Sequence, residues 1–224
     1  YTTPTGITGA CCNDSDKYSW KIAKIGAKAW ADVTMSSDGI KIFAPVSGSF
    51  IFISEDSGVT WRQTAISTWW NSISASSDGT KLIANNGTIG GLTGVLFYSL
   101  DSGNTWNSSV TPQAGGAFEQ VTSSNDGQYV IVTRSQTSIS TNSICVRSTN
   151  FGQNWSNVSN LSSSNAEWYS VASSGSGQIA YIGERSNNTA IRMYKSTNYG
   201  QNWSLIGAAT GIPVSNSIKW YGIA

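Results

Sequence analysis

Ser54-Glu-Asp-Ser-Gly-Val-Thr-Trp61 is the first of four copies of one pattern in the sequence. The others are Ser99-Leu-Asp-Ser-Gly-Asn-Thr-Trp106, Ser148-Thr-Asn-Phe-Gly-Gln-Asn-Trp155 and Ser196-Thr-Asn-Tyr-Gly-Gln-Asn-Trp203, and the four serines are 45, 49 and 48 residues apart. A segment that begins with an aromatic residue and ends in a polar glycine turn precedes each copy. These segments are Trp30–Gly39, Trp70–Gly79, Phe118–Gly127 and Trp168–Gly177, and a fifth begins at Trp220. Self-similarity at a fixed period indicates a repeat architecture.

Each repeat divides into four short strands. In the first repeat the inner strand begins at Trp30, and the next three are 41–45, 50–54 and 61–66. Short β-rich runs separated by Asp-Gly and Ser-Gly turns predict antiparallel meanders, and no helical periodicity of useful length is present. Four antiparallel strands that recur at this period are typical of a β-propeller, so we expect an all-β fold.

The two ends of the chain supply a fifth blade when they are laid end to end. Aligning Trp220 with Trp30 makes the C-terminus an inner strand, and aligning Trp20 with Trp61 makes the N-terminus the other three strands. We therefore expect one domain, residues 1–224, that is a five-bladed β-propeller of four-stranded antiparallel blades, closed by N- and C-terminal strands sharing the last blade. Closure removes unpaired sheet edges. A fragment of a larger ring is the alternative.

The four copies resemble the Asp-box, or BNR repeat, of sialidases, xyloglucanases and sortilin-type receptors, and 13–20 is a decayed fifth copy. Asp or Asn at the third position can accept N–H bonds from its own turn, and the glycine allows a positive φ. Each tryptophan can fold back over its turn. The resemblance implies a structural role for Ser54, Asp56, Gly58, Trp61, Ser99, Asp101, Gly103, Trp106, Ser148, Asn150, Gly152, Trp155, Ser196, Asn198, Gly200 and Trp203. We call these four segments the box turns.

Topology predicts a binding face opposite the box turns. Loops of variable length gather there, and the inner strands begin there with an aromatic residue. Aromatic faces stack on sugar rings, and amides bond to hydroxyl groups. The predicted ligand-binding residues are Trp30, Trp70, Phe118, Trp168 and Trp220, with Asn71, Tyr169 and Tyr221 beside them; Trp69 also lies there. The alternative is that these rings only fill the gaps between adjacent blades.

Composition restricts the classes of function. The net charge is +1 and the chain has no His, which argues against a nucleic-acid surface and excludes His-dependent triads and His metal sites. A sialidase needs an arginine cluster, a Tyr–Glu pair and six blades, which this sequence does not match. We therefore expect no enzyme activity, no cofactor and no metal, and a lectin-like protein similar in size and blade number to five-bladed tachylectin-type lectins. A structural or adhesive module, or less favourably a sialidase-like glycoside hydrolase, stays open.

Sequons and the N-terminus favour an extracellular protein. Expected glycosylation sites are Asn13, Asn86, Asn107, Asn154, Asn157, Asn160, Asn187 and Asn202. The chain begins at Tyr1, which indicates a processed product or a fragment. The partners we expect are glycans or glycoproteins and an extracellular assembly partner, with no nucleic acid and no membrane insertion, because no apolar run is long enough to span a bilayer. The three cysteines are too few for a disulfide framework and are expected to be buried thiols.

Overall fold

A computed structural model of the chain describes residues 25–87, 94–109, 117–135, 145–158, 161, 167–185 and 191–209. These residues contain fifteen strands and no helix. The strands are β1 (Thr34–Met35), β2 (Ile42–Pro45), β3 (Ser47–Ser54), β4 (Arg62–Ala75), β5 (Leu82–Asn86), β6 (Leu96–Ser99), β7 (Asn107–Ser109), β8 (Ala117–Ser123), β9 (Val130–Ser135), β10 (Cys145–Ser148), β11 (Ser156–Asn157), β12 (Glu167–Ser173), β13 (Ala180–Arg185), β14 (Ile191–Ser196) and β15 (Ser204–Ala209).

The strands form four antiparallel repeat units. Units 3 and 4 are separate four-stranded sheets, β8 to β11 and β12 to β15, while units 1 and 2 form one seven-stranded sheet in the order β1 to β7. Strand β4 is shared: its first half pairs with β3 as the outer strand of unit 1, and its second half pairs with β5 as the inner strand of unit 2. The segment between Trp61 and Trp70 has no Gly or Pro to interrupt a strand, which explains this continuity.

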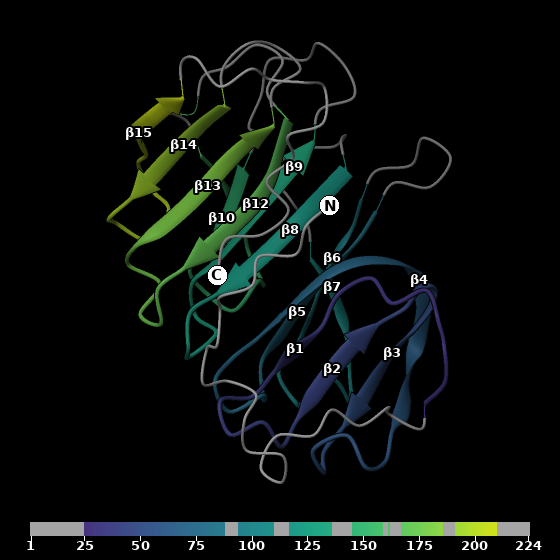
Figure 1. The fold of residues 1–224 in the computed structure, drawn as a ribbon. Helices are drawn as coiled ribbons and strands as arrows, with labels where there is room; N and C mark the ends of the chain where they lie inside the picture. Colours follow the sequence, from purple (N-terminus) through teal and green to yellow (C-terminus); the bar gives the residue numbers. More distant parts are fainter. Residues whose placement is uncertain are drawn as a thin grey trace, which may run out of the picture.

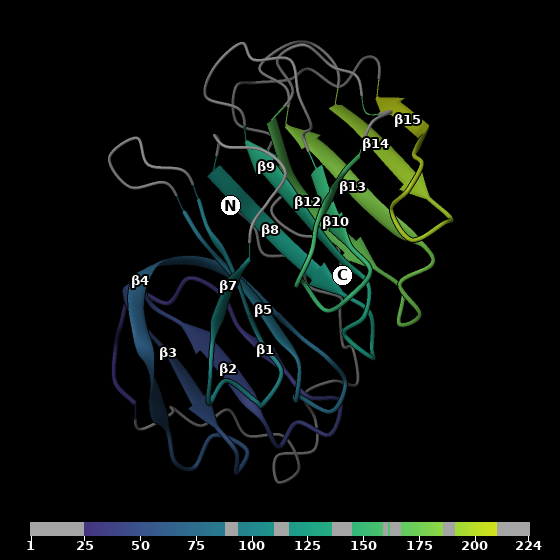
Figure 2. The same cartoon turned by 180° about the vertical axis from the view of Figure 1, so that it is seen from behind.

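Successive units lie side by side in chain order. Inner strands β8 and β12 are neighbours in both views, above the sheet of units 1 and 2 (Figures 1 and 2). The polar turns after the inner strands are joined from unit to unit. Ser37 N–H donates to Ser77 O, Ser77 N–H to Asn125 O, and Asn125 N–H to Gly175 O, each at 2.7 Å. This repeated bond fixes the same offset between each pair of units.

The described residues form three hydrophobic core clusters, and each lies between two successive units. Every cluster contains one aromatic residue from the start of an inner strand: Trp70, Phe118 or Trp168. Cys145 is fully buried in the third cluster. Because strand residues of both neighbours contribute to each cluster, stability depends on the contact between units as well as on each sheet.

The box turns close on themselves through hydrogen bonds. In the first, Ser54 Oγ donates to Asp56 Oδ1 (2.8 Å) and accepts Gly58 N–H (2.8 Å), while Thr60 donates its N–H to Oδ1 (2.8 Å) and its hydroxyl to Oδ2 (2.6 Å). Trp61 Nε1 donates to the glycine carbonyl at 3.0 Å. In the third and fourth copies Asn Oδ1 accepts the equivalent N–H. In all four copies the glycine has a positive φ, and so does the residue before it.

The predicted fifth blade falls on residues outside the described part of the chain. Its strands were expected near the N-terminus and at 220–224, and the structure describes neither. The three described sheets do not close into a ring. Four units are therefore observed, and the fifth stays a prediction.

Candidate functional site

Three of the predicted ligand-binding aromatics are core residues. Trp70, Phe118 and Trp168 are at most 1% exposed, so none of them offers a face to a sugar ring. They fill the gaps between units, which is the alternative that the sequence left open. Trp30 is 39% exposed. Trp220, Tyr221 and the side chain of Tyr169 lie outside the described residues.

Asn71 bonds to the protein itself. Its Nδ2 donates to the carbonyls of Phe118 and Glu119 in the next unit, at 3.0 Å each. Asn85 Nδ2 also donates to the Glu119 carbonyl, at 3.2 Å. Since both donor hydrogens of Asn71 hold units 2 and 3 together, the prediction that this amide bonds to a sugar hydroxyl is not supported by the geometry.

Trp69, the neighbour of Trp70 in β4, is an exposed aromatic residue. It is 53% exposed, because consecutive strand residues point to opposite faces and Trp70 occupies the buried one. One side of the Trp69 ring lies over Gly48, where an added side-chain carbon would be 3.7 Å from three ring atoms. A rigid backbone therefore supports an accessible indole.

A continuous strip of residues leads from Trp69 into unit 3. Gly87 N–H donates to Trp69 O at 2.9 Å, and Asn86 Nδ2 donates to Thr68 Oγ1 at 3.2 Å. Gly94 lies between Asn86 and Phe118: a side-chain carbon there would be 3.0 Å from Asn86 O and 2.9 Å from the Phe118 ring. The Arg134 guanidinium lies over that ring, 4.9 Å from its centroid. We call Trp69, Asn86, Gly94, Phe118 and Arg134 the β4–β9 rim.

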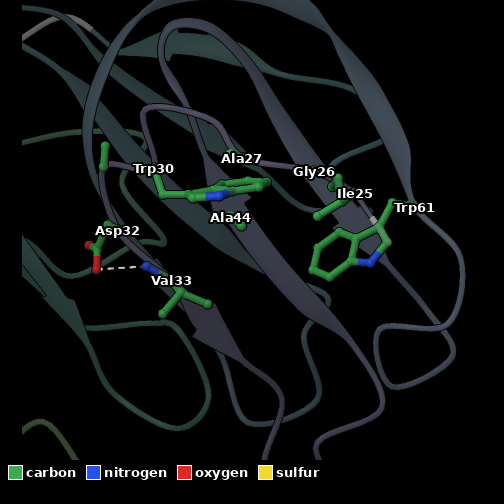
Figure 3. Close-up of a pocket in the computed structure, with 9 residues that line it drawn as sticks. Ile25, Gly26, Ala27, Trp30, Asp32, Val33, Ala44 and Trp61 are labelled. Atoms are coloured by element: carbon green, nitrogen blue, oxygen red, sulfur yellow. Dashed lines mark hydrogen bonds between the residues drawn. The ribbon is translucent and has the colours of Figure 1, made fainter. Parts of the chain in front are cut away.

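A cavity of about 650 Å³ lies beside Trp30 in unit 1. Figure 3 shows the Trp30 ring between Asp32 and Val33 on one side and Trp61 on the other. Its full lining is Ile25, Gly26, Ala27, Trp30, Ala31, Asp32, Val33, Ala44 and Trp61. The Asp32 carboxylate is already bonded: Oδ1 accepts Val33 N–H (2.8 Å), and Oδ2 accepts Ser72 Oγ–H (2.8 Å) and Ile73 N–H (3.0 Å).

Two of the lining residues, Trp30 and Val33, have equivalents that are buried between the other units. Val33 is 65% exposed, whereas its equivalents Ile73, Val121 and Val171 are buried. The same holds for Trp30 and its three buried equivalents. The cavity therefore lies on the side of unit 1 that corresponds to the buried side of the other three units, and its lining does not bring several polar groups together around a ligand.

The turn carboxylates have structural bonds that stabilise their charged form. Hydrogen bonds from Thr60 lower the pKa of Asp56 to about 2, and Ser36 and Ser124 similarly lower the pKa values of Asp38 and Asp126. In the part of the chain that the structure describes, no three His, Cys, Asp or Glu residues gather as a metal site. No helix among these residues is long and apolar enough to cross a bilayer.

The expected glycosylation sites differ in accessibility. Asn86 is partly buried, and its Oδ1 accepts Val95 N–H at 2.6 Å, so attachment of a glycan would compete with these bonds. Asn13, Asn160 and Asn187 lie outside the described residues. The exposed sites are Asn107, Asn154, Asn157 and Asn202.

No protein-family model matches the sequence, and neither does any curated protein. Solved structures do match the fold. An ancestral GH74 enzyme is 18% identical, with a TM-score of 0.61 over 79% of this chain and 25% of its own. The GH74 enzyme of Niastella koreensis is 15% identical (TM-score 0.62, 80% and 30%), and an oligogalacturonate lyase is 10% identical (0.60, 79% and 52%). The chain thus spans a quarter to about half of their length.

These comparisons correct one expectation. The sequence predicted that the chain is not an enzyme, and that prediction is contradicted because the structures that share its fold include glycoside hydrolases and a lyase. Similarity at this level of identity shows the fold alone. The chain has a β-propeller fold, which carbohydrate-active enzymes also use.

Proposed function

We propose that this chain is a carbohydrate-binding β-propeller and that its ligand binds at the β4–β9 rim, with the exposed Trp69 ring as the stacking surface. The observation that carries the proposal is Trp69, a half-exposed indole supported by the backbone of Gly48. Flat aromatic faces suit the apolar faces of sugar rings, and a rigid platform keeps the entropic cost of binding low. Glycans or glycoproteins met outside the cell are the proposed partners.

The fold supports this proposal in a second way. The solved structures that share this fold include GH74 glycoside hydrolases and an oligogalacturonate lyase, so the same fold occurs in enzymes that are named for carbohydrate substrates. The Asp-box resemblance points in the same direction. Loops on one side of a rigid sheet scaffold are where binding sites concentrate, and the β4–β9 rim is on that side.

Binding is tested by calorimetric titration of the full chain with oligosaccharides selected on a glycan array. The Trp69→Ala variant should lose about tenfold or more in affinity, because stacking on an aromatic ring contributes most of the binding free energy at a weak carbohydrate site. Leu205→Ala is the matched control, since Leu205 is equally exposed but lies on β15. No glycan binding by the natural chain, or equal binding by the Trp69 variant, would remove the proposal. Chromatography of the bound oligosaccharides reports whether they are also cleaved.

We also propose that 1–24 and 220–224 form a fifth unit that packs on unit 1 and closes the ring. The exposed face around Trp30 and Val33 supports this, since the same face is buried in the other three units. Unit 4 presents the complementary side, where Ile179 is exposed and Tyr181 is partly exposed. The occupant follows from the sequence repeat, because Trp220-Tyr-Gly-Ile-Ala224 repeats the inner-strand pattern.

A hydrogen bond that recurs between inner strands gives further support. Asp32 Oδ2 accepts Ile73 N–H, Ser72 Oγ accepts Val121 N–H, and Gln120 Oε1 accepts Val171 N–H. The next acceptor in this series is Ser170 Oγ, which is fully buried and has no partner. The next donor in sequence is the N–H of Ile223. A buried hydroxyl without a partner is costly, and docking of 220–224 would satisfy it.

The bond that would close the series, between Val33 N–H and residue 222, has no side-chain acceptor in this sequence. In a closed ring Val33 N–H would face residue 222, but Gly222 has no side chain to accept a bond. Val33 N–H is instead bonded by its own neighbour, through Asp32 Oδ1 at 2.8 Å. Asp32 differs from the other acceptors of the series in having two carboxylate oxygens. Its Oδ1 accepts Val33 N–H within unit 1, and its Oδ2 accepts Ile73 N–H from unit 2.

A further inference from the structure

Arg134 is a buried cation in the described structure. It is 4% exposed, it stacks on the Phe118 ring, and no hydrogen bond or ion pair joins it to another described residue. Burial lowers the pKa of its guanidinium, and no neighbouring charge contributes to that shift. A buried charge that is neither paired nor hydrogen-bonded is expensive, and a cation–π contact offsets only part of the cost.

The scaffold does not require this arginine. The residue that pairs with the inner-strand aromatic is Val46 in unit 1, Asn86 in unit 2, Arg134 in unit 3 and Glu184 in unit 4. The position therefore accepts apolar, amide, cationic and anionic side chains. A guanidinium at one of four equivalent positions indicates a specific role rather than a repeat constraint.

The sequence around Arg134 offers no acidic partner. The segments 88–93, 110–116 and 136–144, which adjoin the strands of units 2 and 3 in the sequence, contain no Asp or Glu. Glu119 follows Phe118 in β8, but it forms no ion pair with Arg134, whose pKa is shifted by burial and not by a neighbouring charge. The charge complement of Arg134 therefore has to come from outside these segments.

We propose that Arg134 binds the carboxylate of an acidic sugar, a uronic acid within an oligosaccharide whose neighbouring ring stacks on Trp69. This inference rests on the carbohydrate-binding function proposed above and specifies its ligand class. A guanidinium binds a planar carboxylate through two parallel N–H···O bonds. Asn86 lies between Trp69 and Phe118 in the β4–β9 rim, and the backbone of Gly94 lies close to both Asn86 and Phe118 without an intervening side chain. The rim thus has an exposed indole at one end and, at the other, a guanidinium that stacks on Phe118 and is 4% exposed.

The test compares a charged ligand with its neutral counterpart on the natural chain. Galacturonic acid oligomers and their methyl esters differ in the carboxylate charge and in one methyl group per ester, and sulfated oligomers of neutral sugars provide a second anion. Affinity for the acid should exceed that for the methyl ester by about 10- to 100-fold at low salt, the range for a hydrogen bond to a charged group, and should decline as salt is added. The Arg134→Met variant should bind acid and ester equally, and Arg134→Lys should restore part of the preference.

Each outcome decides one proposal. Equal affinity of the natural chain for acid and ester, or an acid preference that persists in Arg134→Met, overturns the role of Arg134 and leaves carbohydrate binding intact. If the natural chain binds neither the acid, the ester nor the neutral oligomers, the proposed carbohydrate-binding function itself is overturned. Tighter binding of the sulfated oligomer than of the uronate also contradicts the inference, because it assigns the cation to a different anion.

Discussion

Trp69 and Trp70 are neighbours in the sequence but should respond very differently to truncation. Trp70 is 1% exposed and packs edge-on against Phe97 (5.2 Å between centroids) and beside Trp106 (6.0 Å). Removing a buried Trp side chain costs about 3 to 5 kcal/mol. The buried Trp70 Nε1 has no partner, which places the expected loss for Trp70→Ala near the lower limit, about 3 kcal/mol. Trp69→Ala should cost less than about 1 kcal/mol.

Chemical denaturation of the two variants measures this difference in the free energy of unfolding, and thermal denaturation measures it as a difference in Tm. For a chain of this size, 3 kcal/mol corresponds to a fall of about 6 to 12 °C in Tm. Trp70→Phe is an internal control and should be nearly neutral, because Phe118 occupies the equivalent position in unit 3 and the substitution removes the unpaired N–H. If Trp69→Ala destabilises as much as Trp70→Ala, or Trp70→Ala costs under 1 kcal/mol, the assignment of one ring to the core and the other to the surface is wrong.

Three further predictions concern the scaffold. The pKa of Asp56 is lowered from 3.8 to about 2, mainly by hydrogen bonds from Thr60, so its contribution to the free energy of unfolding is lost as pH falls from about 4 towards 2; urea denaturation of Asp56→Asn should show a shallower pH dependence there, and an unchanged slope would contradict this. Burial raises the pKa of Cys145 to about 12, so a chain whose other two cysteines are replaced by serine should react with a thiol reagent only upon unfolding, and rapid labelling of the folded protein would refute it. Gly103→Ala should destabilise by about 2 to 4 kcal/mol, because φ is +78° and the new carbon would lie 2.5 Å from Ile53 Cδ1; a loss below about 1 kcal/mol would show that the turn tolerates a side chain.

The repeat and turn chemistry could be predicted from the sequence because their signals are local. A glycine that needs a positive φ and an Asp or Asn that accepts N–H bonds from its own turn leave the same pattern in every copy. The positive φ of Ser57, Ser102, Phe151 and Tyr199 was not predicted, since no residue type marks it. The continuity of β4 was also missed, although the absence of Gly and Pro before Trp70 was a usable signal.

The binding face was predicted less well because burial between units is not a local property. Trp70, Phe118 and Trp168 begin inner strands near the loop face, and the sequence alone does not say whether their rings point outward or into the neighbouring unit. Period-two alternation could have separated Trp69 from Trp70, because adjacent strand residues point to opposite faces. The role of Arg134 could be recognised only from the strand register. Its pairing with Phe118 shows that it is the unit 3 equivalent of Asn86, which pairs with Trp70 in unit 2.

Contacts between inner strands identify where the C-terminal residues should dock. Ser74 Oγ lies 2.8 Å from Ser123 Oγ, and Thr122 Oγ1 lies 3.0 Å from Ser173 Oγ, so the fifth residue of one inner strand meets the sixth residue of the next. In the segment that begins at Trp220 the fifth residue is Ala224, and in unit 1 the sixth is Met35.

A cysteine pair at these two positions tests most directly whether the chain closes on itself. With the natural cysteines replaced by serine, Met35→Cys combined with Ala224→Cys should form an intramolecular disulfide upon mild oxidation, read by mass spectrometry of the digested monomer. Ser74→Cys with Ser123→Cys should also cross-link, and Ser123→Cys with Ala224→Cys should not. A closed ring predicts the 35–224 disulfide in most molecules, whereas its absence in a folded protein whose 74–123 pair cross-links would contradict closure by these residues.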